Sequence, residues 1–159
     1  MRSSEFEITN PEKLDQLLLA LVEMIINAQN DETDFGRVAA GILDTDNRFV
    51  PALNRLDHET NTRVHAERAA IDRYHSEVGE IPTGSIIITT LSPCTDPDMR
   101  ERFDASCDEL INSGTVKKVY CGYIDPTQDK NSSKQYHLKE TQNPRIRTMC
   151  KRIAHTFLD

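Results

Sequence analysis

The chain has 159 residues, of which 37% are hydrophobic and 28% charged, and its formal net charge is −7. This length suits one domain over residues 1–159 with a core of its own, and the composition excludes a disordered chain. The acidic balance disfavours polynucleotide substrates, because Lys and Arg must neutralise their phosphates. The sequence contains no apolar run of about 20 residues, as a membrane span requires, and residues 1–5 lack the apolar region typical of a signal peptide. We therefore expect a cytoplasmic protein whose four cysteines stay reduced.

The first predicted element is a helix that begins at Asn10-Pro11, an N-cap residue followed by proline at the first helical position. Apolar residues then recur at helical spacing: Leu14, Leu17, Leu18, Leu21, Val22 and Ile25. Such a stripe can be a partner-binding surface, but it is more often core, so we expect a helix packed on a sheet. Residues 27–36 are polar and predict a loop.

Residues 37–43 and 48–53 predict two strands, and the turn-forming run Asp44–Asn47 between them indicates a hairpin. Pro51 cannot donate to a ladder, which places the second strand at an edge or at a bulge. Asn54 follows directly, eleven residues before His65. By residue type alone it is a capping or turn asparagine. Residues 55–63 read as a polar loop.

A helical pattern starts at Val64 and contains His65 and Glu67 near its beginning. Residues two apart diverge by about 200° on a regular helix, so these two side chains converge only at a helix start. The positive end of the helix dipole would favour an ionised carboxylate there.

Residues 85–91 are strongly β-branched and predict a strand covered on both faces, which delivers Cys94 at its C-terminal end. Twelve residues, rich in charge, separate Cys94 from Cys107. Ser106 and Glu109 form a capping box that places Cys107 in the first turn of a further helix, where its thiolate would be favoured.

Residues 116–124 predict another strand, and Cys121 within it reads as a core residue, as does Cys150. The polar residues 125–143 predict a long loop, in which 135–138 is the one candidate for a fifth strand. Asn143-Pro144 then opens a closing amphipathic helix. The fold class is therefore α/β, with a mixed sheet of four or five strands and helices on both faces.

His65, Cys94 and Cys107 together offer one imidazole and two thiolates, a set that suits zinc. Three protein ligands leave a fourth position for water, as in catalytic zinc sites. Taken alone, His-Ala-Glu and Pro-Cys are common, and each cysteine reads equally as a buried small residue. The order H-x-E, then P-C, then a second cysteine is the signature of zinc nucleobase deaminases.

On these motifs the chain resembles the cytidine deaminase-like superfamily from about residue 36 to 125. Residues 90–94 (Thr-Leu-Ser-Pro-Cys) are similar to the "TLEPC" of the branch with tRNA adenosine deaminases and the riboflavin-pathway deaminase, although Ser92 replaces the glutamate. Residues 110–120, followed by Asp125-Pro126, are similar to the riboflavin-pathway enzyme, which also spaces its two cysteines widely. The resemblance implies a three-layer sandwich, zinc on His65, Cys94 and Cys107, a proton shuttle at Glu67, a substrate contact from Asn54, and possible homo-oligomers.

We therefore expect a hydrolytic deaminase that releases ammonia from an amino-substituted base, nucleoside or nucleotide, with cytosine or aminopyrimidine types favoured. Zinc would lower the pKa of a water molecule, and Glu67 would move its proton to the ring and then to the leaving amine. Three alternatives stay open: a deaminase of bases within RNA or single-stranded DNA, a zinc-binding module without turnover, and a chain without metal.

Overall fold

The structure is a computed structural model that describes residues 10–31, 38–57, 62–92, 114–124 and 136–158. Its helices are α1 (Pro11–Asp31), α2 (Ala66–Glu77) and α4 (Pro144–Leu158). Its strands are β1 (Ala39–Leu43), β2 (Phe49–Leu53), β3 (Arg55–Asp57), β4 (Thr62–Val64), β5 (Ile86–Leu91), β6 (Lys118–Tyr123) and β7 (His137–Glu140). None of the helices in these ranges has both the length and the apolar character needed to cross a membrane.

Five strands form one mixed sheet in the order β2-β1-β5-β6-β7. β1 pairs antiparallel with β2 and β5, whereas β5–β6 and β6–β7 are parallel. The expected α/β class with four or five strands is confirmed with five. The fifth strand is β7, which overlaps the weak candidate at 135–138.

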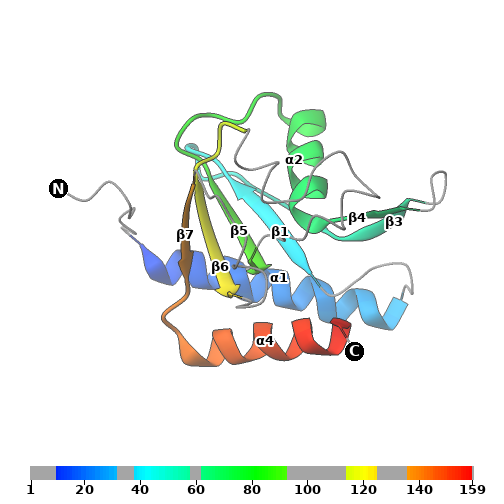
Figure 1. The fold of residues 1–159 in the computed structure, drawn as a ribbon. Helices are drawn as coiled ribbons and strands as arrows, with labels where there is room; N and C mark the ends of the chain where they lie inside the picture. Colours follow the sequence, from blue (N-terminus) through cyan, green and yellow to red (C-terminus); the bar gives the residue numbers. More distant parts are fainter. Residues whose placement is uncertain (1–9, 32–37, 58–61, 93–113, 125–135, 159) are drawn as a thin grey trace.

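Helices cover both faces of this sheet, as Figure 1 shows. α1 and α4 lie side by side on one face, where the α1 stripe packs with Ile88, Tyr120 and Cys150. α2 covers the other face, and its residues Ala66, Ala70 and Tyr74 pack with strand residues such as Ile87 and Val119. The α1 stripe is thus core, as expected, and the three-layer arrangement is confirmed.

Local signals are confirmed where side chains cap helices. The side chain of Asn10 accepts a hydrogen bond from the Lys13 N–H, and that of Asn143 accepts from the N–H groups of Arg145 and Ile146. Pro51 lies in β2, an edge strand, as its missing N–H predicted.

Several boundaries differ from the sequence prediction, and three of these differences concern α1, α2 and the chain between β2 and α2. α1 continues past residue 27 to Asp31, so the helix extends beyond Ile25, the last residue of its apolar stripe. α2 begins at Ala66 and not at Val64, because Val64 still pairs in a strand. The region predicted as a loop, 55–63, instead forms β3 and the first two residues of β4. The two strands make an antiparallel ribbon whose register pairs Arg55 with Val64.

Candidate active site

The candidate site lies at one edge of the sheet, where four strands end together. β2, β5, β6 and β7 all point the same way, since β1 is antiparallel to both of its neighbours and the other pairs are parallel. Asn54 follows β2, and Ser92 follows β5. The carboxyl edge of such a sheet is the usual place for a ligand site.

The β3–β4 ribbon brings Asn54 to the start of α2. Arg55 pairs with Val64, so the next residue outward on each strand is Asn54 on one side and His65 on the other. The two residues therefore leave the open end of the ribbon together. This pairing is the structural reason for their separation of eleven residues in the sequence.

His65 and Glu67 occupy the first positions of α2. His65 is the N-cap, with extended backbone (φ −68°, ψ 153°), and its imidazole does not cap the helix. Glu67 lies in the first turn and is only 3% exposed. Burying an ionised carboxylate is costly unless positive charge compensates it, and the N-terminal helix dipole supplies part of that compensation.

Small side chains let α2 start close to the sheet. Ala66 and Ala70 are completely buried and pack with Ala40 of β1 and Ile87 of β5. Because an alanine adds only one methyl group, the helix start approaches the strands closely. The imidazole of His65 and the carboxylate of Glu67 are thereby held at the edge of the sheet.

The far end of α2 is tied to the β1–β2 turn by a buried carboxylate. Asp44 accepts hydrogen bonds from the N–H groups of Asp46 and Arg48 and, at 2.8 Å, from the hydroxyl of Tyr74. Burial alone raises the pKa of Asp44, but these hydrogen bonds outweigh it and hold the pKa below its ordinary value. Arg73 also donates to the carbonyl of Pro51. This anchor was not predictable from the sequence, because Asp44 is typical of a turn and Tyr74 is one apolar position among several in the helical pattern.

Asn54 is 8% exposed and bonds to the start of β1. Its backbone N–H donates to the carbonyl of Val38 at 3.1 Å, and its Oδ1 accepts from the Val38 N–H at 3.3 Å. The side chain thus has a structural role across the β1–β2 pair, which differs from the capping or turn role that residue type alone predicted. Its place at the end of the ribbon beside His65 also suits a substrate contact.

Ser92, the residue that follows β5 and precedes the predicted ligand Cys94 by two positions, is held in place by β6. Ser92 is 6% exposed, and its N–H donates to the carbonyl of Tyr123 at 2.9 Å. Cys94 and Cys107 lie outside the described residues. Within the described ranges no group of three His, Cys, Asp or Glu side chains could hold a metal. The ligand set predicted from the sequence, one imidazole and two thiolates, fits zinc by its chemistry, and the one described member of this set, His65, is half-buried at the start of α2.

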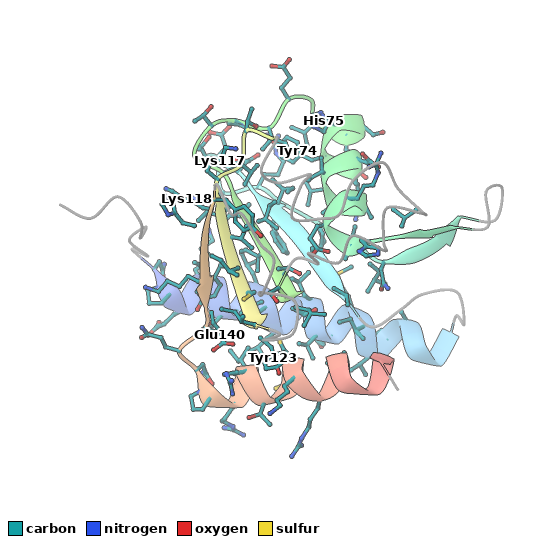
Figure 2. The ribbon with its side chains drawn as sticks, in the orientation of Figure 1. Tyr74, His75, Lys117, Lys118, Tyr123 and Glu140 are labelled. Atoms are coloured by element: carbon teal, nitrogen blue, oxygen red, sulfur yellow. The ribbon has the colours of Figure 1, made fainter. Side chains whose placement is uncertain are left out.

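Hydrogen bonds of Glu140 join the end of β6 to β7 and α4. Figure 2 labels Glu140 and Tyr123, which lie at this end of the two strands. Glu140 accepts from the N–H of Ile124 at 2.7 Å and from Nε of Arg147 at 2.9 Å. The guanidinium of Arg147 and the ammonium of Lys151 lie over the Tyr123 ring, at 5.5 and 5.8 Å from its centroid. Cys121 and Cys150 are both buried, which agrees with their predicted place in the core.

Residues 11–123 match the family described as "Cytidine and deoxycytidylate deaminase zinc-binding region". The chain belongs to this family. The matched range includes Asn54, His65, Glu67, Cys94 and Cys107, so every residue singled out by the motifs lies inside it. No curated protein matches the chain.

Two solved structures show the same fold. RibD of Acinetobacter baumannii is 15% identical with a TM-score of 0.64, and the match covers 94% of this chain and 40% of that one. A diaminohydroxyphosphoribosylaminopyrimidine deaminase/5-amino-6-(5-phosphoribosylamino)uracil reductase of Thermotoga maritima is 18% identical with a TM-score of 0.61, covering 94% and 42%. The chain thus spans about two fifths of the length of these proteins.

Proposed function

We propose that this chain is a zinc-dependent hydrolytic deaminase of a small amino-substituted nucleobase compound. Cytosine or aminopyrimidine rings are favoured, as base, nucleoside or nucleotide. The observation that carries the proposal is the buried carboxylate of Glu67 at the start of α2, two residues past His65, in a chain of the deaminase family. A purely structural zinc site has no use for such a carboxylate beside an open position.

In the proposed reaction, His65, Cys94 and Cys107 would hold the zinc ion. When bound, zinc makes water acidic enough to supply hydroxide near neutral pH. Glu67 takes the proton of that water as the C–O bond to the amino-bearing ring carbon forms, and it passes the proton to a ring nitrogen. Glu67 then takes the remaining proton from the new hydroxyl group and transfers it to the amino group. The C–N bond breaks as the C=O bond forms, and ammonia leaves. Asn54 would hold the substrate beside this carboxylate.

Charge placement supports a small substrate over a polynucleotide. Lys117 and Lys118 lie at the opposite end of β6 from Tyr123, away from the edge at which Asn54 follows β2 (Figure 2). At the site's edge, Arg147 is paired with Glu140. The Thermotoga protein is named for a phosphoribosyl-aminopyrimidine substrate, which is a compound of the proposed size. A cytoplasmic location and self-association stay predictions from the sequence.

Ammonia release tests the reaction directly. The panel should hold cytosine, adenine, guanine and aminopyrimidine compounds as bases, nucleosides and nucleotides. Replacing Glu67 by Gln should keep zinc and lower turnover about 10²- to 10⁴-fold, the usual contribution of a positioned acid–base group. Glu77→Gln is the matched control, because Glu77 is exposed in the last turn of the same helix and should leave turnover unchanged. Loss of zinc from Glu67→Gln would make this residue a ligand, and full zinc without turnover of any compound would favour the binding module.

Zinc analysis tests the ligand set. We expect about one zinc per chain, lost in Cys107→Ser and kept in Cys121→Ser, because Cys121 is a buried residue of β6. Full zinc in Cys107→Ser would remove Cys107 from the set.

A salt series separates the small-molecule reading from nucleic-acid editing. Turnover of a single nucleotide should exceed that of a single-stranded oligonucleotide with the same base. Faster deamination of the oligonucleotide, with a steep loss as salt rises, would contradict the proposal, since the slope reports phosphate contacts.

A further inference from the structure

The peptide group that follows β6 is held from both sides. Its carbonyl, that of Tyr123, accepts a hydrogen bond at 2.9 Å from the N–H of Ser92, the residue after β5. Its N–H, that of Ile124, donates at 2.7 Å to Oε2 of Glu140 in β7. The carbonyl and the N–H of a trans peptide group lie in one plane and point in opposite directions. Ser92 and Glu140 therefore bind opposite sides of one rigid unit.

The carboxylate of Glu140 replaces a main-chain partner at this point. The β6–β7 register ends at the pair Cys121 and Glu140, and the N–H of Thr141 still donates to the Cys121 carbonyl at 2.8 Å. The chain then leaves the sheet, and α4 begins at Pro144. Beyond the end of β7, it is the side chain of Glu140 that reaches the N–H of Ile124. An ionised acceptor on the N–H polarises the peptide group, which makes its carbonyl a stronger acceptor on the other side.

Arg147 of α4 holds this carboxylate in place. Its Nε donates to Oε1 of Glu140 at 2.9 Å while Oε2 serves Ile124, so each oxygen has its own donor. The Arg147 guanidinium also lies over the ring of Tyr123, 5.5 Å from its centroid. The side chains of Glu140 and Arg147 are 25% and 45% exposed, and an ion pair so accessible to water adds little to stability. What the pair supplies is the orientation of the carboxylate.

Ser92 connects this arrangement to the predicted ligand Cys94. The two residues are separated in the sequence only by Pro93. A proline ring fixes its own φ and restricts the backbone of the residue before it. An orientation set at Ser92 is thus transmitted along the chain, because few backbone rotations are left to absorb it.

We propose that Glu140 is a positioning residue of the active site. Its carboxylate fixes the peptide group that binds Ser92, and thereby the direction in which the chain continues to Cys94. This inference rests on the proposed function, in which Cys94 is a zinc ligand. It adds a residue that acts on that ligand through hydrogen bonds of the main chain.

Glu140→Gln tests this role in the zinc-loaded chain. The single amide oxygen of glutamine can accept from only one of the two donors, and its NH2 group faces the other. We expect hydrogen exchange of the Ser92 N–H, followed by NMR, to become roughly 10-fold faster, while the N–H groups of β1 exchange as before. Unchanged exchange in β1 separates a local effect from a general loss of stability. The zinc dissociation constant, measured by competition with a chelator, should also rise roughly 10-fold, the lower end of the usual loss for residues that orient metal ligands.

Glu77→Gln is the matched control. Glu77 pairs with Arg73 at 2.6 Å on α2, which covers the other face of the sheet, and both side chains are partly exposed. The same substitution there should leave Ser92 exchange and the zinc dissociation constant unchanged. Arg147→Ala, at an exposed position of α4, removes the support of Glu140 but keeps the acceptor for Ile124. It should raise the zinc dissociation constant about two- to fivefold, as expected for the loss of one exposed ion pair.

The outcomes separate this inference from the proposed function. Full zinc in Cys94→Ser, or no zinc in the unaltered chain, refutes the ligand set and this inference with it. Zinc bound through Cys94, with unchanged Ser92 exchange or an unchanged zinc dissociation constant in folded Glu140→Gln, overturns the positioning role alone. If Glu140→Gln does not fold, Arg147→Ala decides, and an unchanged zinc dissociation constant in that variant overturns the role.

Discussion

Gly122 of β6 is the position at which one added methyl group should matter most for the packing of α4. A Cβ there would overlap Sγ of Cys150 and would lie 2.9 Å from the Cβ of Cys150 and 3.1 Å from the carbonyl oxygen of Thr90. The Thr90 carbonyl belongs to the neighbouring central strand and cannot yield. Cys150 must therefore move, and α4 with it.

Overpacking of this kind costs about 1–3 kcal/mol. For a chain of this size, a loss of 1 kcal/mol lowers the melting temperature by roughly 2–4 °C. We therefore expect Gly122→Ala to lower it by about 2–12 °C. The change also bears on the site, because the adjacent Tyr123 carbonyl accepts the N–H of Ser92, two residues before Cys94.

Urea unfolding of Gly122→Ala, Cys150→Ala and the double variant tests this account. Cys150→Ala alone should cost about 1 kcal/mol, like the loss of a buried methyl group. In the double variant the added methyl group no longer overlaps Sγ, and only its contact with the Cβ of residue 150 remains. The double variant should therefore lose less unfolding free energy than the sum of the losses in the two single variants. Strict additivity, or a Gly122→Ala chain within about 0.5 kcal/mol of the unaltered one, would refute the steric reasoning.

Two further predictions concern pH. Burial raises the pKa of the Cys150 thiol to about 12, whereas the pKa of a cysteine in the unfolded chain is about 8.5. The proton is thus held more tightly in the folded chain, and the contribution of Cys150 to stability should fall as pH rises from about 9 toward 12. Urea midpoints over this range should fall less steeply in Cys150→Ala; equal slopes would contradict the assignment. The effect of Asp44 has the opposite sign, because its pKa in the folded chain lies below the ordinary value. Asp44 therefore stabilises the folded chain at pH values above about 3.9, and this stabilisation is lost as the pH falls through the pKa of the folded state. Acid unfolding followed by circular dichroism should show a flatter acid limb in Asp44→Asn, and an unchanged limb would mean that other carboxylates dominate.

The sequence alone determined the elements that rest on short-range signals. The caps at Asn10 and Asn143 and the short apolar or β-branched runs in 39–43 and 86–91 depend on near neighbours, so the order of residues along the chain suffices to predict them. The H-x-E and P-C motifs are equally local, and they led to the family that the chain belongs to. The ligand roles of Cys94 and Cys107, which lie outside the described residues, stay predictions.

Only the tertiary structure decided how distant residues meet. The register of the β3–β4 ribbon sets Asn54 beside His65, and nothing in the polar run 55–63 announces that pairing. The bond from Val38 to Asn54 joins residues sixteen positions apart, and that from Ala39 to Thr90 joins residues fifty-one apart. Such contacts depend on which strands become neighbours and in which register, and this is settled by burial across the whole sheet. The orientation of the Asn54 amide follows from that pairing, because a side-chain oxygen can replace a main-chain carbonyl only once the partner strand is in place.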